Sequence, residues 1–215
     1  MKPTRAWVLT PSWHAPCTVF SQPHPPMLFE AYPDYRPRDF IFKIATTPSE
    51  LDGYWNLRRR VFCDEQHVFH DGHDRDAIDD HAIPLICATL VAGMIDEVVG
   101  VVRIDEREPR LWYGSRLCVD KDFRKLTQMS PGVSARNHQP VYKGFGALGA
   151  GLIYKAVSTA NAIGCDRFLA DVQEQNEKFF QRLHWERLGE NQLHGLRHIH
   201  MQAQLNQYPA AAMVA

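Results

Sequence analysis

The chain has 215 residues, 45% of them hydrophobic, and a formal net charge of −1 at pH 7. This length fits one domain that buries a sizeable core. Because positive and negative charges nearly cancel, the composition excludes a strongly basic surface, and we expect no nucleic-acid partner. No apolar run approaches the length of a membrane span, so we expect no membrane partner either.

Five cysteines are scattered through the chain without C-x-x-C spacing. An odd count of this kind fits reduced thiols better than a disulfide framework. The N-terminus also lacks the uninterrupted apolar core of a signal peptide. We therefore expect a cytoplasmic protein.

Proline density divides the chain. Eight prolines fall between residues 1 and 38, which blocks helices and central strands there. The residues after Tyr208-Pro209 are mostly alanine and should fray. We predict an N-terminal arm over residues 1–38, a folded domain over 39–208 and a flexible tail over 209–215.

The first predicted elements are a strand and a helix. Apolar and polar residues alternate over 40–44, which predicts the strand. Thr47 then suits a helix N-cap, Pro48 the first helical position, and Glu50 completes a capping box. An acidic and histidine-rich loop, residues 64–81, ends this helix.

Three strands are expected next, over residues 83–91, 98–105 and 111–119, with the first two joined as a hairpin through Gly93. Such consecutive strands make an antiparallel meander. Residues 120–142 are polar and broken by glycine and proline, so they predict an extended loop.

The C-terminal part alternates between helices and strands. We predict a helix from the glycine-rich segment to about Ile163, stopped by Gly164. The further elements are a strand over 168–172, a short helix over 176–183, and two strands centred on 185–188 and 198–205.

The most informative segment is Gly-Phe-Gly-Ala-Leu-Gly-Ala-Gly, residues 144–151. Glycines that open a helix favour a phosphate or pyrophosphate ligand, because the backbone N–H groups are accessible. Read literally, Gly144, Gly146 and Gly149 spell the dinucleotide fingerprint G-x-G-x-x-G, and Asp171 lies near the place of the ribose-binding acid.

The surroundings contradict a dinucleotide site. That fingerprint needs an apolar strand directly before the first glycine, and residues 135–143 are too polar to form one. The preceding half of the chain is also a meander rather than a series of βαβ units. A Walker loop fails because no Gly-Lys-Ser or Gly-Lys-Thr follows. A turn whose glycines bind nothing is the structural alternative.

A pyrophosphate loop after antiparallel strands resembles the GNAT family of acyl-CoA-dependent N-acetyltransferases. Residues 143–152 resemble its Arg/Gln-x-x-Gly-x-Gly/Ala signature, with Lys143 in the leading basic place. Residues 116–119 resemble the strand that pairs with pantetheine, and residues 175–185 the usual Asn…Phe-Tyr-Glu-Lys-Leu-Gly-Phe ending. Residues 193–209 are similar to a bacterial branch associated with nitrogen-starvation gene clusters.

The resemblance implies an α+β sandwich: a mixed, mostly antiparallel sheet with helices on both faces and CoA in the splay between the fourth and fifth strands. It implies acetyl-CoA as co-substrate, no metal, a small-molecule amine as acceptor, and compatibility with a homodimer. The residues that it assigns to CoA are Leu117, Cys118, Val119, Arg124, Lys143, Gly144, Phe145, Gly146, Ala147, Leu148, Gly149, Ala150, Asn176 and Phe180.

Two parts of the CoA assignment stay open. Counting from Lys143 puts Leu148 at the last small position of the signature, whereas aligning the helix puts Gly149 there. Because residues 126–142 are an insertion relative to the family, the cation that reaches the phosphates is Arg124, Arg136 or Lys143.

Direct attack requires a neutral amine and hence a proton acceptor. The resemblance places Glu65 at the end of the first helix beside the acceptor cleft, which makes it the first candidate; a surface or helix-cap role is the alternative. The other candidates are Asp79, Asp80, His81 and Tyr113.

Phe180 occupies the place of the family's thiolate-protonating tyrosine. A benzene ring has no proton to donate. Tyr113, Tyr154 or water would then protonate the thiolate, or it leaves unassisted.

Two other groups of residues receive structural interpretations. His67, His70 and His73 match no common zinc pattern, so we expect a solvated acidic loop whose carboxylates would attract a cationic acceptor. Cys63 and Cys118 lack a convincing base and are interpreted as packed thiols.

Two further functions are considered. Residues 58–66 resemble a GNAT subgroup that is itself similar to acyl-homoserine lactone synthases, which favours transfer of a longer acyl chain. The phenylalanine at position 180 favours a catalytically silent acyl-CoA sensor.

Overall fold

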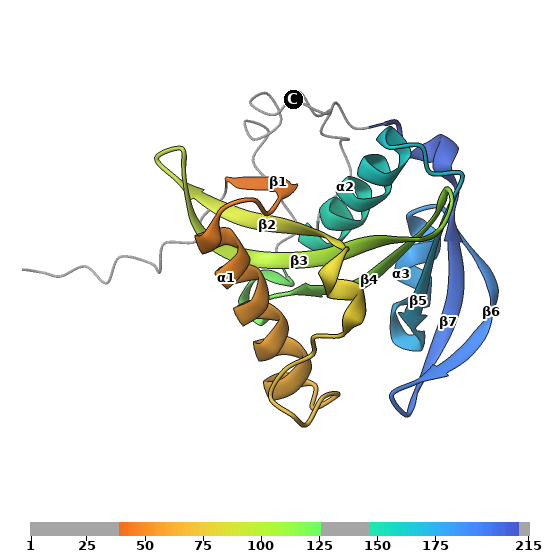
Figure 1. Cartoon of the computed structure of the whole chain (residues 1–215), viewed down its shortest axis with the longest axis horizontal. Helices are drawn as coiled ribbons and strands as arrows, with labels where there is room; N and C mark the ends of the chain where they lie inside the picture. The colour runs from red at the N-terminus through yellow and green to blue at the C-terminus, as the bar shows by residue number, and fades with distance from the viewer. Residues whose placement is uncertain (1–38, 126–146, 211–215) are drawn as a thin grey trace, which may run out of the picture. The chain divides into compact units, whose positions relative to one another are not determined.

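A computed structural model describes residues 39–125 and 147–210 of the chain (Figure 1). The described residues all belong to the unit Arg36–Ala215. The predicted N-terminal arm therefore lies outside the described residues, and the domain boundaries stay predictions.

The described residues form a seven-stranded sheet in the order β1-β2-β3-β4-β5-β7-β6. Neighbouring strands are antiparallel except β4 and β5, which are parallel. This confirms the predicted meander and the mixed, mostly antiparallel sheet. The strands are β1 (Phe40–Ile44), β2 (Ile83–Val91), β3 (Met94–Glu108), β4 (Leu111–Val119), β5 (Arg167–Gln173), β6 (Trp185–Leu193) and β7 (Leu196–Ala203).

Helices cover both faces of this sheet, with α1 on one face and α2 on the other (Figure 1). Alternate residues of β2 show the division: Leu85 and Cys87 belong to the core under α2, and Ile86 and Ala88 to the core under α1. The helices are α1 (Pro48–Arg58), α2 (Leu148–Ala162) and α3 (Glu177–Arg182). Shorter helical segments are π-helical Arg59–Glu65 and the 3₁₀ turns Ala77–Asp80, Lys121–Phe123, Glu174–Asn176 and Leu205–Gln207.

The start of α1 agrees with the predicted capping box. The Glu50 N–H donates to the Thr47 hydroxyl at 3.3 Å, and the Thr47 N–H donates to the Glu50 carboxylate at 3.2 Å. After Arg58 the chain keeps turning as a π-helical segment to Glu65. The next residue, Gln66, accepts a hydrogen bond from Gln173 of β5 at 3.4 Å.

Helix α2 approaches β1 closely at a glycine. A Cβ atom at Gly151 would lie 2.5 Å from the ring of Phe42, closer than side-chain packing allows. The helix ends before Gly164, whose φ of +95° favours glycine, as the sequence predicts.

Three strands differ from their predicted ranges. The hairpin turn lies at Ala92 and Gly93, both with positive φ, as predicted, but β3 runs from Met94 to Glu108 and so is longer than residues 98–105 at both ends. The strands predicted to centre on 185–188 and 198–205 run over Trp185–Leu193 in β6 and Leu196–Ala203 in β7. The outer half of β6 is exposed, so no alternation of apolar residues marks it in the sequence.

None of the helices within residues 39–125 and 147–210 combines the length and apolarity that crossing a membrane requires.

Candidate functional site

The parallel pair β4 and β5 separates partway along its length. Pairing runs from Leu111 with Arg167 to Gly114 with Ala170 and stops there. Beyond this point both strands continue without pairing to each other, so the edge of β4 that faces β5 keeps main-chain N–H and C=O groups without a strand partner. The splay that the resemblance implies is therefore present.

A β-bulge in β4 begins directly after the last pair. Arg103 faces Ser115 and Val101 faces Cys118, so two residues of β4 lie opposite the single residue Val102. Arg116, one of those two, has a φ of +54°, a strained conformation for a non-glycine residue. A bulge bends its strand, and this one turns β4 away from β5 where pairing ends.

A cavity of about 750 Å³ occupies the splay. It opens beside the N-terminus of α2, passes between the separated ends of β4 and β5, and reaches the segment after α1 and the β6–β7 turn. Of the predicted CoA residues, those that line it are Leu117, Cys118, Val119, Arg124, Ala147, Leu148, Gly149, Asn176 and Phe180. Lys143, Gly144, Phe145 and Gly146 lie outside the described residues.

The first turn of α2 faces this cavity without a side-chain cap. Ala147 is the N-cap residue and makes no capping hydrogen bond through its side chain. The N–H groups of Ala150 and Gly151 donate to the Ala147 carbonyl at 3.0 and 3.3 Å. The N–H of Ala150, a predicted CoA-binding residue, is therefore already used within the helix. The N–H groups of Leu148 and Gly149 precede the first intrahelical bond and suit an anion such as the CoA pyrophosphate.

The predicted packed thiols are buried. Cys118 is 6% exposed, and burial raises the pKa of its thiol well above the ordinary value. Cys63 is equally buried, and its pKa is likewise raised by burial. Within the described residues no cysteine forms a disulfide. Raised pKa values disfavour the nucleophilic thiolate, in agreement with a packing role.

Phe180 forms part of an aromatic wall of the cavity. It is 7% exposed, and its ring packs edge-to-face against Trp185, with the ring centroids 5.1 Å apart. Of the two tyrosines considered as alternative acids, Tyr113 lines the cavity. Tyr154 packs against Tyr208 and is not among the lining residues.

Glu65 is held by Arg124. Both Glu65 carboxylate oxygens accept from the Arg124 guanidinium, one of them at 2.7 Å. These hydrogen bonds lower the pKa of Glu65 below its ordinary value. Glu65 does not line the cavity, whereas Arg124 does. A carboxylate that is already neutralised and weakly basic is a poor proton acceptor.

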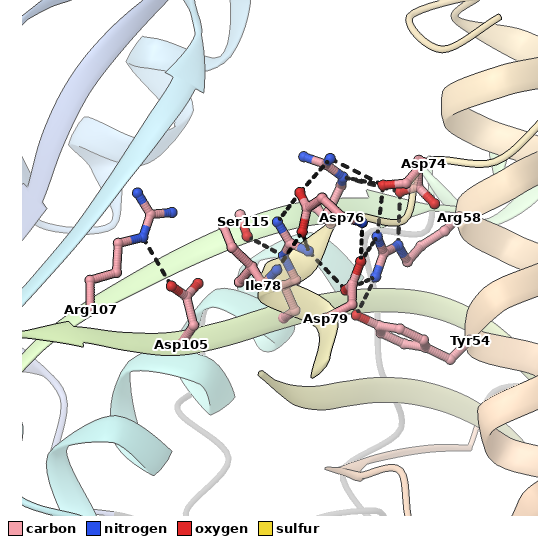
Figure 2. Close-up of polar contacts among 11 residues, drawn as sticks. Tyr54, Arg58, Asp74, Asp76, Ile78, Asp79, Asp105, Arg107 and Ser115 are labelled. Carbon is pink, nitrogen blue, oxygen red and sulfur yellow. Dashed lines mark hydrogen bonds and ion pairs between the residues drawn. The ribbon is translucent and has the colours of Figure 1, made fainter. Parts of the chain in front are cut away.

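The acidic loop is part of a buried ion-pair network, shown in Figure 2. Arg58, which is fully buried, donates to Asp74 at 2.8 Å and to Asp79 at 2.6 and 3.0 Å. Arg103, which is 1% exposed, donates to Asp76 at 2.6 and 2.8 Å. The predicted solvated acidic loop was therefore wrong for Asp74 and Asp79, whose side chains are buried, whereas Asp76 is ion-paired but stays exposed.

Arg116 completes this network. Its guanidinium donates to Asp74 and Asp76, each at 3.1 Å. These contacts offset the backbone strain at Arg116. Asp76 and Asp79 also form a capping box on the turn Ala77–Asp80. The Asp-x-x-Asp spacing of residues 76–79 is the signal for this box in the sequence.

The network predicts acid sensitivity. Burial by itself raises the pKa of Asp79, but hydrogen bonds from Arg58 and Arg103 outweigh it and lower the pKa from 3.8 to about 2. A depressed native pKa stabilises the fold above the unfolded value, and this stability is lost as the pH falls from about 4 to about 2. We expect Asp79 to contribute a loss of about 2 kcal/mol in unfolding free energy over this range.

Urea denaturation at several pH values between 5 and 2 measures this loss. Asp79→Asn, which cannot titrate, should show a smaller decline than the unsubstituted protein. Equal declines would contradict the contribution of Asp79.

No three His, Cys, Asp or Glu side chains within residues 39–125 and 147–210 gather as ligands of a metal ion would. His67 contacts the carbonyl of Cys63 through Nδ1 at 3.0 Å.

Comparisons with known proteins bear on the fold. No family model and no curated protein sequence matches the chain. A presumed N-acetyltransferase from Lactobacillus plantarum is 15% identical, with 78% of this chain and 99% of that chain covered and a TM-score of 0.60. An acyl-CoA N-acyltransferase from Pseudomonas aeruginosa is 18% identical, with 77% and 98% covered and a TM-score of 0.55.

A third similar structure is the CoA-dependent acyl-homoserine lactone synthase BjaI with SAM and isopentyl-CoA. It is 18% identical, with 71% of this chain and 74% of that chain covered and a TM-score of 0.51. At identities of 15–18%, the similarity to these structures shows the fold of the chain and nothing finer. The described part of the chain has the α+β fold of the GNAT N-acyltransferases.

Proposed function

We propose that the protein is an acyl-CoA-dependent N-acyltransferase that moves an acetyl group from acetyl-CoA to a small amine. The observation that carries this proposal is that the uncapped N-terminus of α2 and the splayed edges of β4 and β5 open into one cavity. The helix end suits a pyrophosphate, and the open strand edge suits the amide groups of pantetheine.

The chemistry needs few groups from the protein. The amine nitrogen attacks the thioester carbonyl carbon, the C–N bond forms, and the C–S bond breaks with departure of the CoA thiolate. One proton leaves the amine and one neutralises the thiolate. Tyr113 is our candidate for proton transfer in the cavity because its ring lines the cavity wall. Water is the alternative carrier.

A second candidate function is transfer of a longer acyl chain. The cavity continues into the core under α2, where its walls are buried apolar side chains. Such an apolar extension gives acyl carbons a place to leave water, at about 0.8 kcal/mol per CH₂. The residues that form it include Ile153, Ala156, Val157, Phe168, Phe180 and Trp185.

The experiment that tests these functions measures CoA release from acyl-CoA donors of increasing chain length with a panel of primary amines. We expect release that depends on the added amine. A kcat/KM that is highest for acetyl-CoA supports the first function, and one that rises with chain length supports the second. Tight CoA binding without amine-dependent release for any donor would contradict both and favour the silent sensor.

A further inference from the structure

The charged side chains that line the cavity are mostly arginines. Among the described residues, five arginines line it but only two aspartates and no glutamate. Four of the five are paired with carboxylates: Arg103 and Arg116 with the loop aspartates, Arg124 with Glu65, and Arg107 with Asp105. Within the described residues, Arg75 has no carboxylate partner, and Arg107 keeps two terminal nitrogens without a hydrogen-bond acceptor.

Arg107 is held in a fixed orientation by two contacts. Its Nε donates to Asp105 at 2.9 Å, and its guanidinium carbon lies 3.8 Å from the ring centroid of Tyr113. The Asp105 side chain is fully buried, which gives the arginine a rigid anchor. Figure 2 shows the two terminal nitrogens of Arg107 pointing away from Asp105. In the described part of the chain no side chain or carbonyl accepts from them.

This geometry presents a planar pair of N–H donors on the cavity wall. A guanidinium edge of this kind matches the two oxygens of a carboxylate or phosphate. Because Tyr113 and Asp105 already restrict the side chain, little conformational entropy is lost when an anion binds.

Arg75 adds a second positive charge to the same cavity. Its guanidinium carbon lies 3.9 Å from the ring centroid of Trp55, and within the described residues it forms no ion pair. Stacking on an aromatic face holds an arginine in place without neutralising it.

Asp171 supplies an opposite charge at the splay. It is the first residue of β5 beyond the last pair with β4, and it lines the cavity. His200 Nδ1 and Asn191 Nδ2 both lie within hydrogen-bonding distance of its Oδ1, at 2.9 and 2.7 Å. Its other oxygen, Oδ2, accepts no hydrogen bond from the described residues and is suited to an ammonium group.

We propose that the acceptor is an amine that also carries an anionic group, bound with the anion at Arg107 and the amine toward Asp171. Asp74, Asp76 and Asp79 of the 64–81 loop, where the sequence suggested that carboxylates would attract a cation, are paired with arginines instead, so the free donors of Arg107 and the charge of Arg75 are left to meet an anion. This inference rests on the proposed function and narrows its substrate class.

The test compares matched pairs of amines. One arm compares amino acids with their carboxamides and tests for recognition of a carboxylate. The other compares phosphoethanolamine with ethanolamine and tests for recognition of a phosphate. We expect kcat/KM for one anionic series to exceed that of its neutral partners at least about 10-fold. Arg107→Gln should remove most of that advantage, about 10- to 100-fold, because hydrogen bonds to charged groups are stronger than neutral ones.

Arg110→Gln is the matched control. Arg110 follows β3, is 63% exposed and pairs with Asp166 outside the cavity lining, so its replacement should leave the anionic preference unchanged. The dissociation constant of CoA should also stay the same in Arg107→Gln. A weaker CoA affinity in that variant would assign Arg107 to CoA and overturn the proposal.

Equilibrium titration of the same amines into the protein–CoA complex gives a second readout that does not need turnover. Tighter binding of an anionic series, lost in Arg107→Gln, supports the proposal even if catalysis fails. Equal affinity for anionic and neutral partners overturns it, although amine-dependent CoA release would still uphold the proposed function.

Discussion

Replacing Arg58 with methionine should lower the free energy of unfolding by about 3–5 kcal/mol, because it removes one partner from a buried ion-pair network. Arg58 is fully buried and donates to Asp74, Asp79 and the hydroxyl of Tyr54. Methionine fills a similar volume, so the main loss is charge compensation rather than packing.

Arg60→Met is the control for this expectation. Arg60 lies two residues further along the chain, is 47% exposed, and pairs with Glu97 and Asp120. Exposed pairs contribute at most about 1 kcal/mol. Urea denaturation monitored by circular dichroism measures both variants. If Arg58→Met unfolds at the same urea concentration as Arg60→Met, the network does not stabilise the fold.

Placing an aspartate at Ala147 is expected to change stability and CoA binding in opposite directions. An N-cap aspartate accepts from the first-turn N–H groups of α2, which lack a side-chain cap, and should stabilise the protein by about 0.5–2 kcal/mol. The same negative charge would repel the pyrophosphate and occupy its donors. We expect the dissociation constant of CoA to rise about 100-fold, which corresponds to about 3 kcal/mol.

Ala147→Asn separates the two effects, since asparagine caps the helix without adding charge. It should stabilise the protein similarly while weakening CoA binding less than aspartate does. Thermal unfolding and calorimetric titration with CoA measure the two quantities. CoA affinity unchanged in Ala147→Asp would show that the pyrophosphate does not bind at the start of α2.

Local signals in the sequence predicted much of the fold. The capping box of Thr47 and Glu50 fixed the start of α1, and Gly164 marked the end of α2. Both depend on hydrogen bonds or backbone angles within a few residues, which the sequence displays directly. The outer part of β6 escaped prediction because its residues are exposed and polar, and pairing with β7 decides its conformation.

The sequence predicted less of the candidate site than of the fold. The sequence indicated an anion-binding start of a helix; α2 does start at Leu148, and Leu148 and Gly149 line the cavity, while anion binding there stays a prediction. Charged residues at alternate positions of β3, namely 103, 105 and 107, were also visible in the sequence. Their partners were not, since Asp76 and Tyr113 come from other segments of the chain.

The sequence by itself determined most of the secondary structure, the antiparallel meander and the helix that follows the glycines, because these depend on short-range periodicity, capping and turn residues. Only the tertiary structure decided which charges are free. The loop aspartates are neutralised by arginines from α1, β3 and β4, whereas Arg107 and Asp171 keep unpaired polar atoms at the cavity. The sign of the charge that a pocket presents depends on pairing between residues far apart in the chain, and local patterns contain no information about such pairs.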